Sequence, residues 1–189
     1  MLPSTFDELK KRLEINEGCR LKAYQDTKGI WTIGYGFNLQ RASVPAVCAS
    51  LSLAGINVKG ITSLEDLSKL EITQEEADKL FANDIPKYIT KASGLLDSGV
   101  FDSMTPARQI ALVDFIYNEG GADFPVTLHI LNQAQKEKNA GNLTKAHALF
   151  MVVGDHLRAS EYDREVGARA SRNIFMLETG SLCDPTWQG

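Results

Sequence analysis

Two acidic residues and a hydroxyl residue near the N-terminus have the types and spacing that water-activating chemistry needs. Glu17, Asp26 and Thr32 fall within one short stretch. A carboxylic acid that donates a proton, together with a carboxylate that activates water or attacks a sugar carbon, is the minimum set of groups for breaking a glycosidic bond. By type alone these residues could equally be solvated charges, and Asp26 more simply caps a turn. The pattern is therefore a hypothesis that the surrounding elements must support.

A helix is expected to carry Glu17. It is predicted to begin near Ser4 or Thr5, where Thr5 and Glu8 have the spacing of a capping box, and to end at Gly18. Glu17 then lies in the last turn, where the helix dipole and partial burial both disfavour a negative charge. Both effects favour the protonated form, which a general acid needs at neutral pH.

A β-hairpin is expected to carry the other two residues. Residues 21–39 alternate and are rich in aromatic and β-branched side chains, with turn-forming residues from Asp26 to Gly29. This pattern predicts two short strands, with Asp26 at the tip of the hairpin and Thr32 on the returning strand. All three candidate groups would then sit on one small α+β segment.

The order of residues in this segment resembles a known family. The matching residues are Glu17, Gly18, Arg20, Leu21, Lys22, Tyr24, Asp26, Gly29, Thr32, Ile33, Gly34 and Gly36. In this order they resemble the N-terminal lobe of the phage-type lysozymes, glycoside hydrolase family 24. The resemblance implies that Glu17 is the proton donor, that Asp26 holds and deprotonates the attacking water, and that Thr32 positions that water. It also implies inversion at the sugar carbon, which would place the two carboxyl groups ~6.5 to 9.5 Å apart.

The resemblance implies further residues that would line or support a sugar-binding cleft. As substrate contacts these are Asn38, Tyr117, Asn118 and Thr127, and as a supporting residue Arg169, which is expected to approach Glu17. Phe37 departs from the pattern, because several relatives carry histidine there.

The composition argues against nucleic-acid binding and against a metal or cofactor site. The 189 residues carry 20 Lys and Arg against 24 Asp and Glu, a formal net charge of -4, so no broad basic surface for nucleic acid is expected. The three cysteines, Cys19, Cys48 and Cys183, show no metal-binding spacing and are expected to be free thiols. The three histidines are scattered, so neither a metal nor an organic cofactor is expected.

We expect a single lysozyme-like domain over 1–189 in the α+β class. Its small N-terminal lobe, with the hairpin, would cover about 16–72, and its larger helical lobe 95–189 plus 1–15. A connecting helix over 73–94 would begin at a second capping box, Thr73 to Glu76, and bend or break at Pro86. A helix is also predicted around 44–53, ended by Gly55 and followed by at most a weak third strand. Further helices are predicted over 64–70, 107–117, 124–138, 143–153 and 168–177. The glycines expected to end helices in this part of the chain are Gly120, Gly121, Gly141, Gly154 and Gly180.

The expected function is that of a peptidoglycan hydrolase, a muramidase that cleaves the β-1,4 bond between N-acetylmuramic acid and N-acetylglucosamine. Two alternatives stay open: a non-catalytic glycan-binding or virion structural module on the same fold, and a lytic transglycosylase, which needs only one catalytic acid. Product analysis after digestion would separate all three.

The expected partners are the glycan strands of peptidoglycan, and the chain is expected to be a monomer. The N-terminal residues lack the apolar core of a signal peptide, and no run approaches the ~18 apolar residues of a membrane span. We therefore expect synthesis in the cytoplasm, action in the periplasm or at the cell surface, and delivery by a partner such as a holin, a virion or a secretion machinery.

Overall fold

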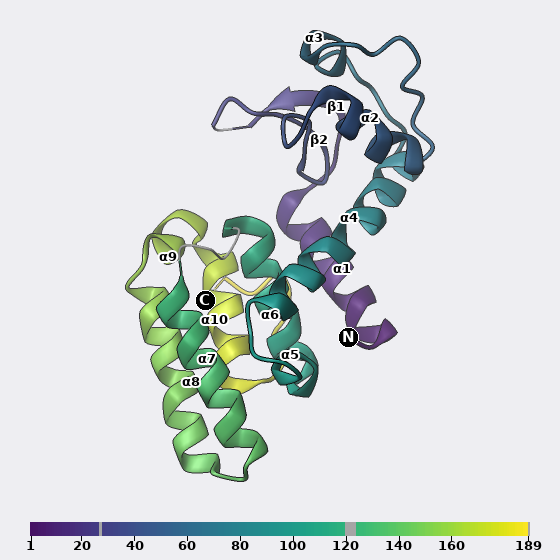
Figure 1. The fold of residues 1–189 in the computed structure, drawn as a ribbon. Helices are drawn as coiled ribbons and strands as arrows, with labels where there is room; N and C mark the ends of the chain where they lie inside the picture. The colour runs from purple at the N-terminus through teal and green to yellow at the C-terminus, as the bar shows by residue number, and fades with distance from the viewer. Residues whose placement is uncertain (27, 120–123, 189) are drawn as a thin grey trace. The chain divides into compact units, whose positions relative to one another are not determined.

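The computed structural model describes residues 1–26, 28–119 and 124–188 (Figure 1). It is mostly helical with a small three-stranded antiparallel sheet near the N-terminus, so the predicted lysozyme-like α+β class is confirmed. Among the described residues, none of the helices combines the length and apolarity needed to cross a membrane. In chain order the elements are α1 (Pro3–Glu17), β1 (Arg20–Gln25), β2 (Trp31–Gly34), β3 (Phe37–Asn38), α2 (Val44–Leu53), α3 (Leu64–Leu67), α4 (Gln74–Gly94), α5 (Val100–Ser103), α6 (Pro106–Glu119), α7 (Pro125–Asn139), α8 (Leu143–Arg158), α9 (Glu161–Val166) and α10 (Ala168–Thr179).

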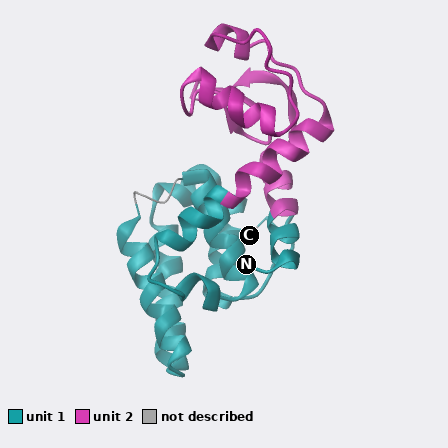
Figure 2. Cartoon of the chain, turned by 45° about the vertical axis from the view of Figure 1, so that its right-hand side comes forward, with its two compact units in different colours: residues 1–9, 87–189 teal, residues 10–86 magenta. Residues whose placement is uncertain are grey.

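The chain forms two compact units, which are described separately below. One comprises residues 10–86 and the other residues 1–9 together with 87–189 (magenta and teal in Figure 2). The long helix α4 passes from one unit to the other, and the division falls directly after Pro86. Of the two predicted outcomes at this proline, the break is wrong, because α4 continues through it, and the bend stays a prediction. Ile85 and Ala92, on either side of the proline, are fully buried, and this packing offsets the backbone hydrogen bond that proline removes.

In the unit of residues 10–86, the sheet has the order β1-β2-β3. Ile33 of β2 pairs with Phe37 of β3, and both side chains are buried on the core face. The outer edge of β1 is covered by the segment before α4, since Ala23 N donates to Leu70 O at 2.9 Å. The predicted hairpin is therefore confirmed. The third strand is wrong in position, because it lies at Phe37–Asn38 and not after Gly55.

Capping boxes were predicted at the starts of α4 and α1, and one of the two is confirmed. At α4, Thr73 N donates to Glu76 Oε2 at 2.8 Å, and Glu76 N donates to Thr73 Oγ1 at 3.2 Å, so that capping box is confirmed. At α1, the predicted capping box is wrong, because the helix starts at Pro3 and Thr5 is a buried residue inside it. Proline is favoured in the first turn, where its missing N–H removes no helical hydrogen bond.

In the other unit, α6 is the most deeply buried helix, and α10 packs against both α6 and α8. The helices α7 and α8 run side by side in opposite directions (Figure 1). Gly141 and Gly180 end helices with positive φ, as predicted, while Gly120 and Gly121 lie outside the described residues. Gly154 is not a terminator, since it lies inside α8. The short helices α5 and α9 were not predicted from the sequence.

Candidate active site

Glu17 is the last residue of α1, as predicted. The helix is anchored by Leu9 and Leu13, which are fully buried, and the next residue, Gly18, leaves the helix with φ of +65°. Only glycine adopts this conformation without strain, so the chain turns immediately after the carboxyl group. Glu17 is half-buried and stands on a rigid helix end.

Asp26 holds the hairpin turn through one carboxylate oxygen. Its Oδ1 accepts hydrogen bonds from Lys28 N and Ile30 N, both at 2.8 Å. The backbone closes the same turn, because Asp26 N donates to Ile30 O at 3.0 Å. The turn-capping role that residue type alone suggested is therefore present. Among the described residues no group donates to Oδ2, so that oxygen is available to a ligand.

Thr32 lies on β2 between Tyr24 of β1 and Asn38 of β3. We call these three residues the cross-strand row. Directly paired residues of antiparallel strands project from the same face, and this face is opposite to the one that buries Ile33. The Thr32 hydroxyl donates to Ile30 O at 3.1 Å and its side chain is only 4% exposed. Since a hydroxyl has a single proton, the lone pairs on this oxygen remain available as acceptors.

Both candidate carboxyl groups affect the pKa of Tyr24. Burial raises the pKa of the Tyr24 phenol, and the nearby carboxyl groups of Glu17 and then Asp26 raise it further, while Arg20 opposes them. The guanidinium of Arg20 lies over the Tyr24 ring, 4.3 Å from its centroid. Tyr24 thus lies within electrostatic reach of Glu17 and Asp26 and pairs with Thr32. The separation of the two carboxyl groups stays a prediction.

A polar cluster that the sequence did not indicate fixes the chain just after Glu17. Tyr35 donates to Asp78 Oδ1 at 2.8 Å, and Gln74 donates both to Tyr35 and to Asp78 at 2.8 Å. Beside this cluster, burial, the largest effect, raises the pKa of the Cys19 thiol, while the nearby Gln74 and Tyr35 side chains lower it. The net effect is a raised pKa, which makes this thiol less reactive.

Phe37, which departs from the family pattern, belongs to the core. Its ring is buried, and Arg41 lies over it with its guanidinium carbon 4.8 Å from the centroid. Arg41 also forms an ion pair of 2.7 Å with Asp84 of α4. Asn38, next to Phe37, accepts from Gln40 N at 2.6 Å, which leaves its amide N–H groups for other partners.

The remaining candidate residues lie in the other unit, at the end of α6 and the start of α7. Tyr117 is half-buried and packs on Tyr88, with ring centroids 4.6 Å apart. Asn118 is exposed and donates to Glu119 at 2.7 Å. Thr127 is buried in the first turn of α7. Their contact with substrate stays a prediction.

Arg169 lies on α10 and forms an ion pair with Asp114 of α6. Its Nε donates to Asp114 Oδ1 at 2.7 Å, and the two side chains are 11% and 3% exposed. Asp114 was not singled out in the sequence, because an isolated acid in an apolar helix gives no sign of a partner 55 positions away. Arg169 is therefore not a solvated surface charge. Its approach to Glu17 stays a prediction.

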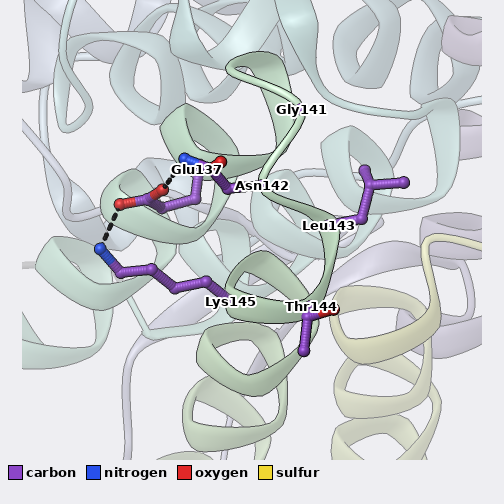
Figure 3. A pocket seen from close by; sticks show the side chains of 6 residues that line it. All are labelled: Glu137, Gly141, Asn142, Leu143, Thr144 and Lys145. Atoms are coloured by element: carbon purple, nitrogen blue, oxygen red, sulfur yellow. Dashed lines mark hydrogen bonds and ion pairs between the residues drawn. The ribbon is translucent and has the colours of Figure 1, made fainter.

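Hollows that none of these candidate residues lines lie in the unit of residues 1–9 and 87–189. One, at the turn between α7 and α8, is lined by Glu137, Gly141, Asn142, Leu143, Thr144 and Lys145 (Figure 3). Lys145 and Asn142 both donate to the carboxylate of Glu137, so these three polar side chains already have partners. Within the described part of the chain, no group of three His, Cys, Asp or Glu side chains is placed to hold a metal ion.

Comparison with known proteins shows the family to which the chain belongs. The family described as Phage lysozyme matches residues 14–152. The chain is 25% identical over 178 residues to the probable T4-type lysozyme 1 of Dictyostelium discoideum, covering 92% of this chain and 95% of that protein. It is 27% identical over 135 residues to an endolysin of Acyrthosiphon pisum secondary endosymbiont phage 1, covering 71% and 69% of the two chains. With a family match over most of its length, the chain belongs to the phage lysozyme family and is a peptidoglycan hydrolase of the lysozyme type.

Proposed function

We propose that the protein hydrolyses the β-1,4 bond between N-acetylmuramic acid and N-acetylglucosamine in peptidoglycan, with inversion at the attacked carbon. The observation that supports this most directly is the grouping of Glu17, Asp26 and Thr32 within one unit, around Tyr24. One carboxyl on a helix end and another on a hairpin tip give the pair of acids that glycoside hydrolysis requires.

Glu17 is the proton donor in this proposal. Its proton passes to the glycosidic oxygen as the bond from that oxygen to the sugar carbon breaks, so the leaving sugar departs as a neutral alcohol. A group with this role must be held still. Glu17 meets the requirement because α1 is anchored by buried leucines up to the turn at Gly18.

Asp26 and Thr32 hold the attacking water. The water donates one hydrogen bond to the Thr32 oxygen, whose own proton goes to Ile30 O, and the other to Asp26 Oδ2, since Oδ1 is occupied by two backbone N–H groups. Both protons of the water are then bound and its lone pair points to the sugar carbon. Asp26 accepts the proton that the water loses on attack, which balances the proton given up by Glu17.

The remaining sugar contacts in this proposal come from Asn38, Tyr117, Asn118 and Thr127, with Arg169 supporting Glu17. Asn38 offers an amide N–H from the cross-strand row. Because the net charge is -4, long-range attraction of an anionic cell wall is weak, and binding depends on local contacts of this kind.

Digestion of purified cell walls, followed by chemical analysis of the fragment ends, tests the proposal. A muramidase leaves reducing N-acetylmuramic acid, a lytic transglycosylase leaves an anhydro sugar, and a non-catalytic module releases nothing. Proton NMR of the first product distinguishes inversion, through the α-anomer, from retention. Glu17→Gln should abolish release while the melting temperature is unchanged or higher.

Glu14→Gln is the matched control for this experiment. Glu14 lies one turn earlier on α1 and pairs with Lys10 at 2.7 Å on the surface, a contact that contributes about 0 to 1 kcal/mol. This variant should release fragments at the wild-type rate. Activity retained in Glu17→Gln, or lost equally in both variants, would refute the assignment of Glu17 as the acid.

We also propose that the protein acts on the peptidoglycan layer after delivery by a partner such as a holin, a virion or a secretion machinery. The support is the substrate itself, which lies outside the inner membrane. Expression in the bacterial cytoplasm should cause lysis only when a pore-forming protein is co-expressed. Lysis of equal speed without that protein would contradict a delivery partner.

A further inference from the structure

Tyr24 occupies a central position that the proposed mechanism does not use. It belongs to the cross-strand row, directly opposite Thr32. Asp26 follows two positions later, directly after the end of β1. Between Arg20 and Tyr24 the register shifts by a bulge, a feature that re-aims side chains near functional sites.

Tyr24 has a cation over its ring and a paired residue on the next strand. Arg20 covers it, with the guanidinium carbon 4.3 Å from the ring centroid, and Thr32 lies beside it on the next strand. The ring is half-buried although Arg20 itself is exposed. Cation–π contact and cross-strand packing together hold an aromatic side chain in one orientation, so its hydroxyl has a defined place.

The hydroxyl of Tyr24 differs from those of two other tyrosines. Tyr35 bonds with Asp78 and Gln74, and Tyr162 accepts from Asn173 at 2.7 Å. In the described parts of the chain, the Tyr24 hydroxyl has no hydrogen-bond partner. A hydroxyl that has no partner within the protein can donate to a bound ligand without first giving up an internal hydrogen bond.

The surroundings of Tyr24 keep its hydroxyl a donor. Burial first, and then the carboxyl groups of Glu17 and Asp26, raise the pKa of the phenol above its usual value. The phenol therefore stays protonated over the whole pH range in which one carboxyl group can act as an acid and another as a base. A neutral donor is also compatible with two neighbouring acids, whereas a cation would pair with one of them.

We propose that Tyr24 is a further substrate-binding residue, whose hydroxyl donates a hydrogen bond to an oxygen of the sugar that bears the attacked carbon. The inference rests on the proposed function, because it places that sugar between Glu17 and Asp26. Its basis is the fixed ring under Arg20, the pairing with Thr32 and the open hydroxyl. The Arg20 side chain acts through the ring and is a positioning residue.

Tyr24→Phe tests this role, because it keeps the ring and removes only the hydroxyl. The kcat/KM for release of fragments from soluble peptidoglycan should fall about tenfold to a hundredfold, the range expected when one donor to the reacting sugar is lost. The melting temperature should stay at the wild-type value, since no hydrogen bond within the described protein is lost. The acidic and basic limbs of the pH profile should also keep their positions.

Tyr162→Phe is the matched control. It also deletes a tyrosine hydroxyl, but one that is buried in the helical unit and bonded to Asn173. This variant should melt at a lower temperature and keep kcat/KM within about twofold when assayed well below its melting point. The two variants together separate a hydroxyl that binds substrate from one that only stabilises the fold.

Wild-type kcat and KM in Tyr24→Phe would overturn the inference, and so would a loss that follows a lowered melting temperature and disappears on cooling. Sedimentation with purified peptidoglycan gives a second measurement without turnover, comparing Glu17→Gln with the Glu17→Gln, Tyr24→Phe double variant. Binding weakened at least fivefold in the double variant supports the role, and equal binding refutes it. If wild-type protein releases no fragments, the proposed function fails, while the binding comparison still decides the role of Tyr24.

Discussion

Gly154→Ala should destabilise the protein strongly, although alanine favours helices over glycine. Gly154 lies in the middle of α8, where the side chain of Glu178 from α10 crosses it. A Cβ atom at this position would lie 2.9 Å from Glu178 Cγ, 2.5 Å from Cδ and closer still to Oε1. Real Cβ atoms essentially never approach other atoms below 3.0 Å, so the Glu178 carboxyl must move.

The cost follows from what Glu178 loses when it moves. Its side chain is 8% exposed and pairs with Arg158 at 2.7 Å. Overpacking costs about 1 to 3 kcal/mol, and the loss of a hydrogen bond to a charged group about 1.5 to 3 kcal/mol. The higher helix propensity of alanine offsets about 1 kcal/mol of this cost. We therefore expect a net loss of about 1.5 to 5 kcal/mol, or a melting temperature lower by about 3 to 20 °C for a chain of this size.

Urea unfolding and thermal melting, both followed by circular dichroism, measure this loss. Gly94→Ala is the control, because Gly94 ends helix α4 and a Cβ there meets nothing within 4 Å. Its stability should be unchanged or higher by up to about 1 kcal/mol. In a Glu178→Ala background the clash is gone, so Gly154→Ala should be neutral or stabilising. Wild-type stability of the single variant, or additive effects in the double-mutant cycle, would refute the reasoning.

Three further outcomes follow from the structure. Thr32→Val keeps the shape of the side chain but removes the oxygen that accepts from water, so kcat should fall about a hundredfold with little change in melting temperature, and equal kcat would contradict the water site. Arg108→Lys should lower the free energy of unfolding by about 2 to 4 kcal/mol in urea, because the Arg108 guanidinium caps α10 through Leu177 O at 2.8 Å and Glu178 O at 2.9 Å and lies over the Phe150 ring. Asp66 accepts from Thr62 and Ser63, which lowers its pKa to about 2, so the carboxylate adds stability that is fully present above the unfolded value of about 3.9 and is lost as the pH falls towards 2. The difference in melting temperature between wild type and Asp66→Ala should therefore shrink over that range, and a constant difference would exclude this linkage.

Local patterns allowed much of the fold to be predicted. The hairpin, the helix end at Glu17, the span of α2 and the capping box before α4 each depend on residues within a few positions of one another. The errors occur where distant packing decides. Glycine often ends a helix, and Gly154 was therefore predicted to end one. It lies inside α8 instead, because the Glu178 side chain occupies the space that a Cβ atom would fill. The start of α1 was misplaced because Thr5 packs inward and Pro3 begins the helix.

The same distinction explains which parts of the site could be read from the sequence. Glu17, Asp26 and Thr32 lie within one continuous helix and hairpin, so their grouping follows from local geometry, and Tyr24 joins them through strand pairing alone. The pairing of Arg169 with Asp114, and of Tyr35 with Asp78, joins segments 55 and 43 positions apart. No short-range pattern encodes such contacts, because they depend on how α10 packs on α6 and how α4 packs on the sheet. The proposed catalytic residues are thus close in sequence, whereas these long-range pairs are fixed only when each unit has folded.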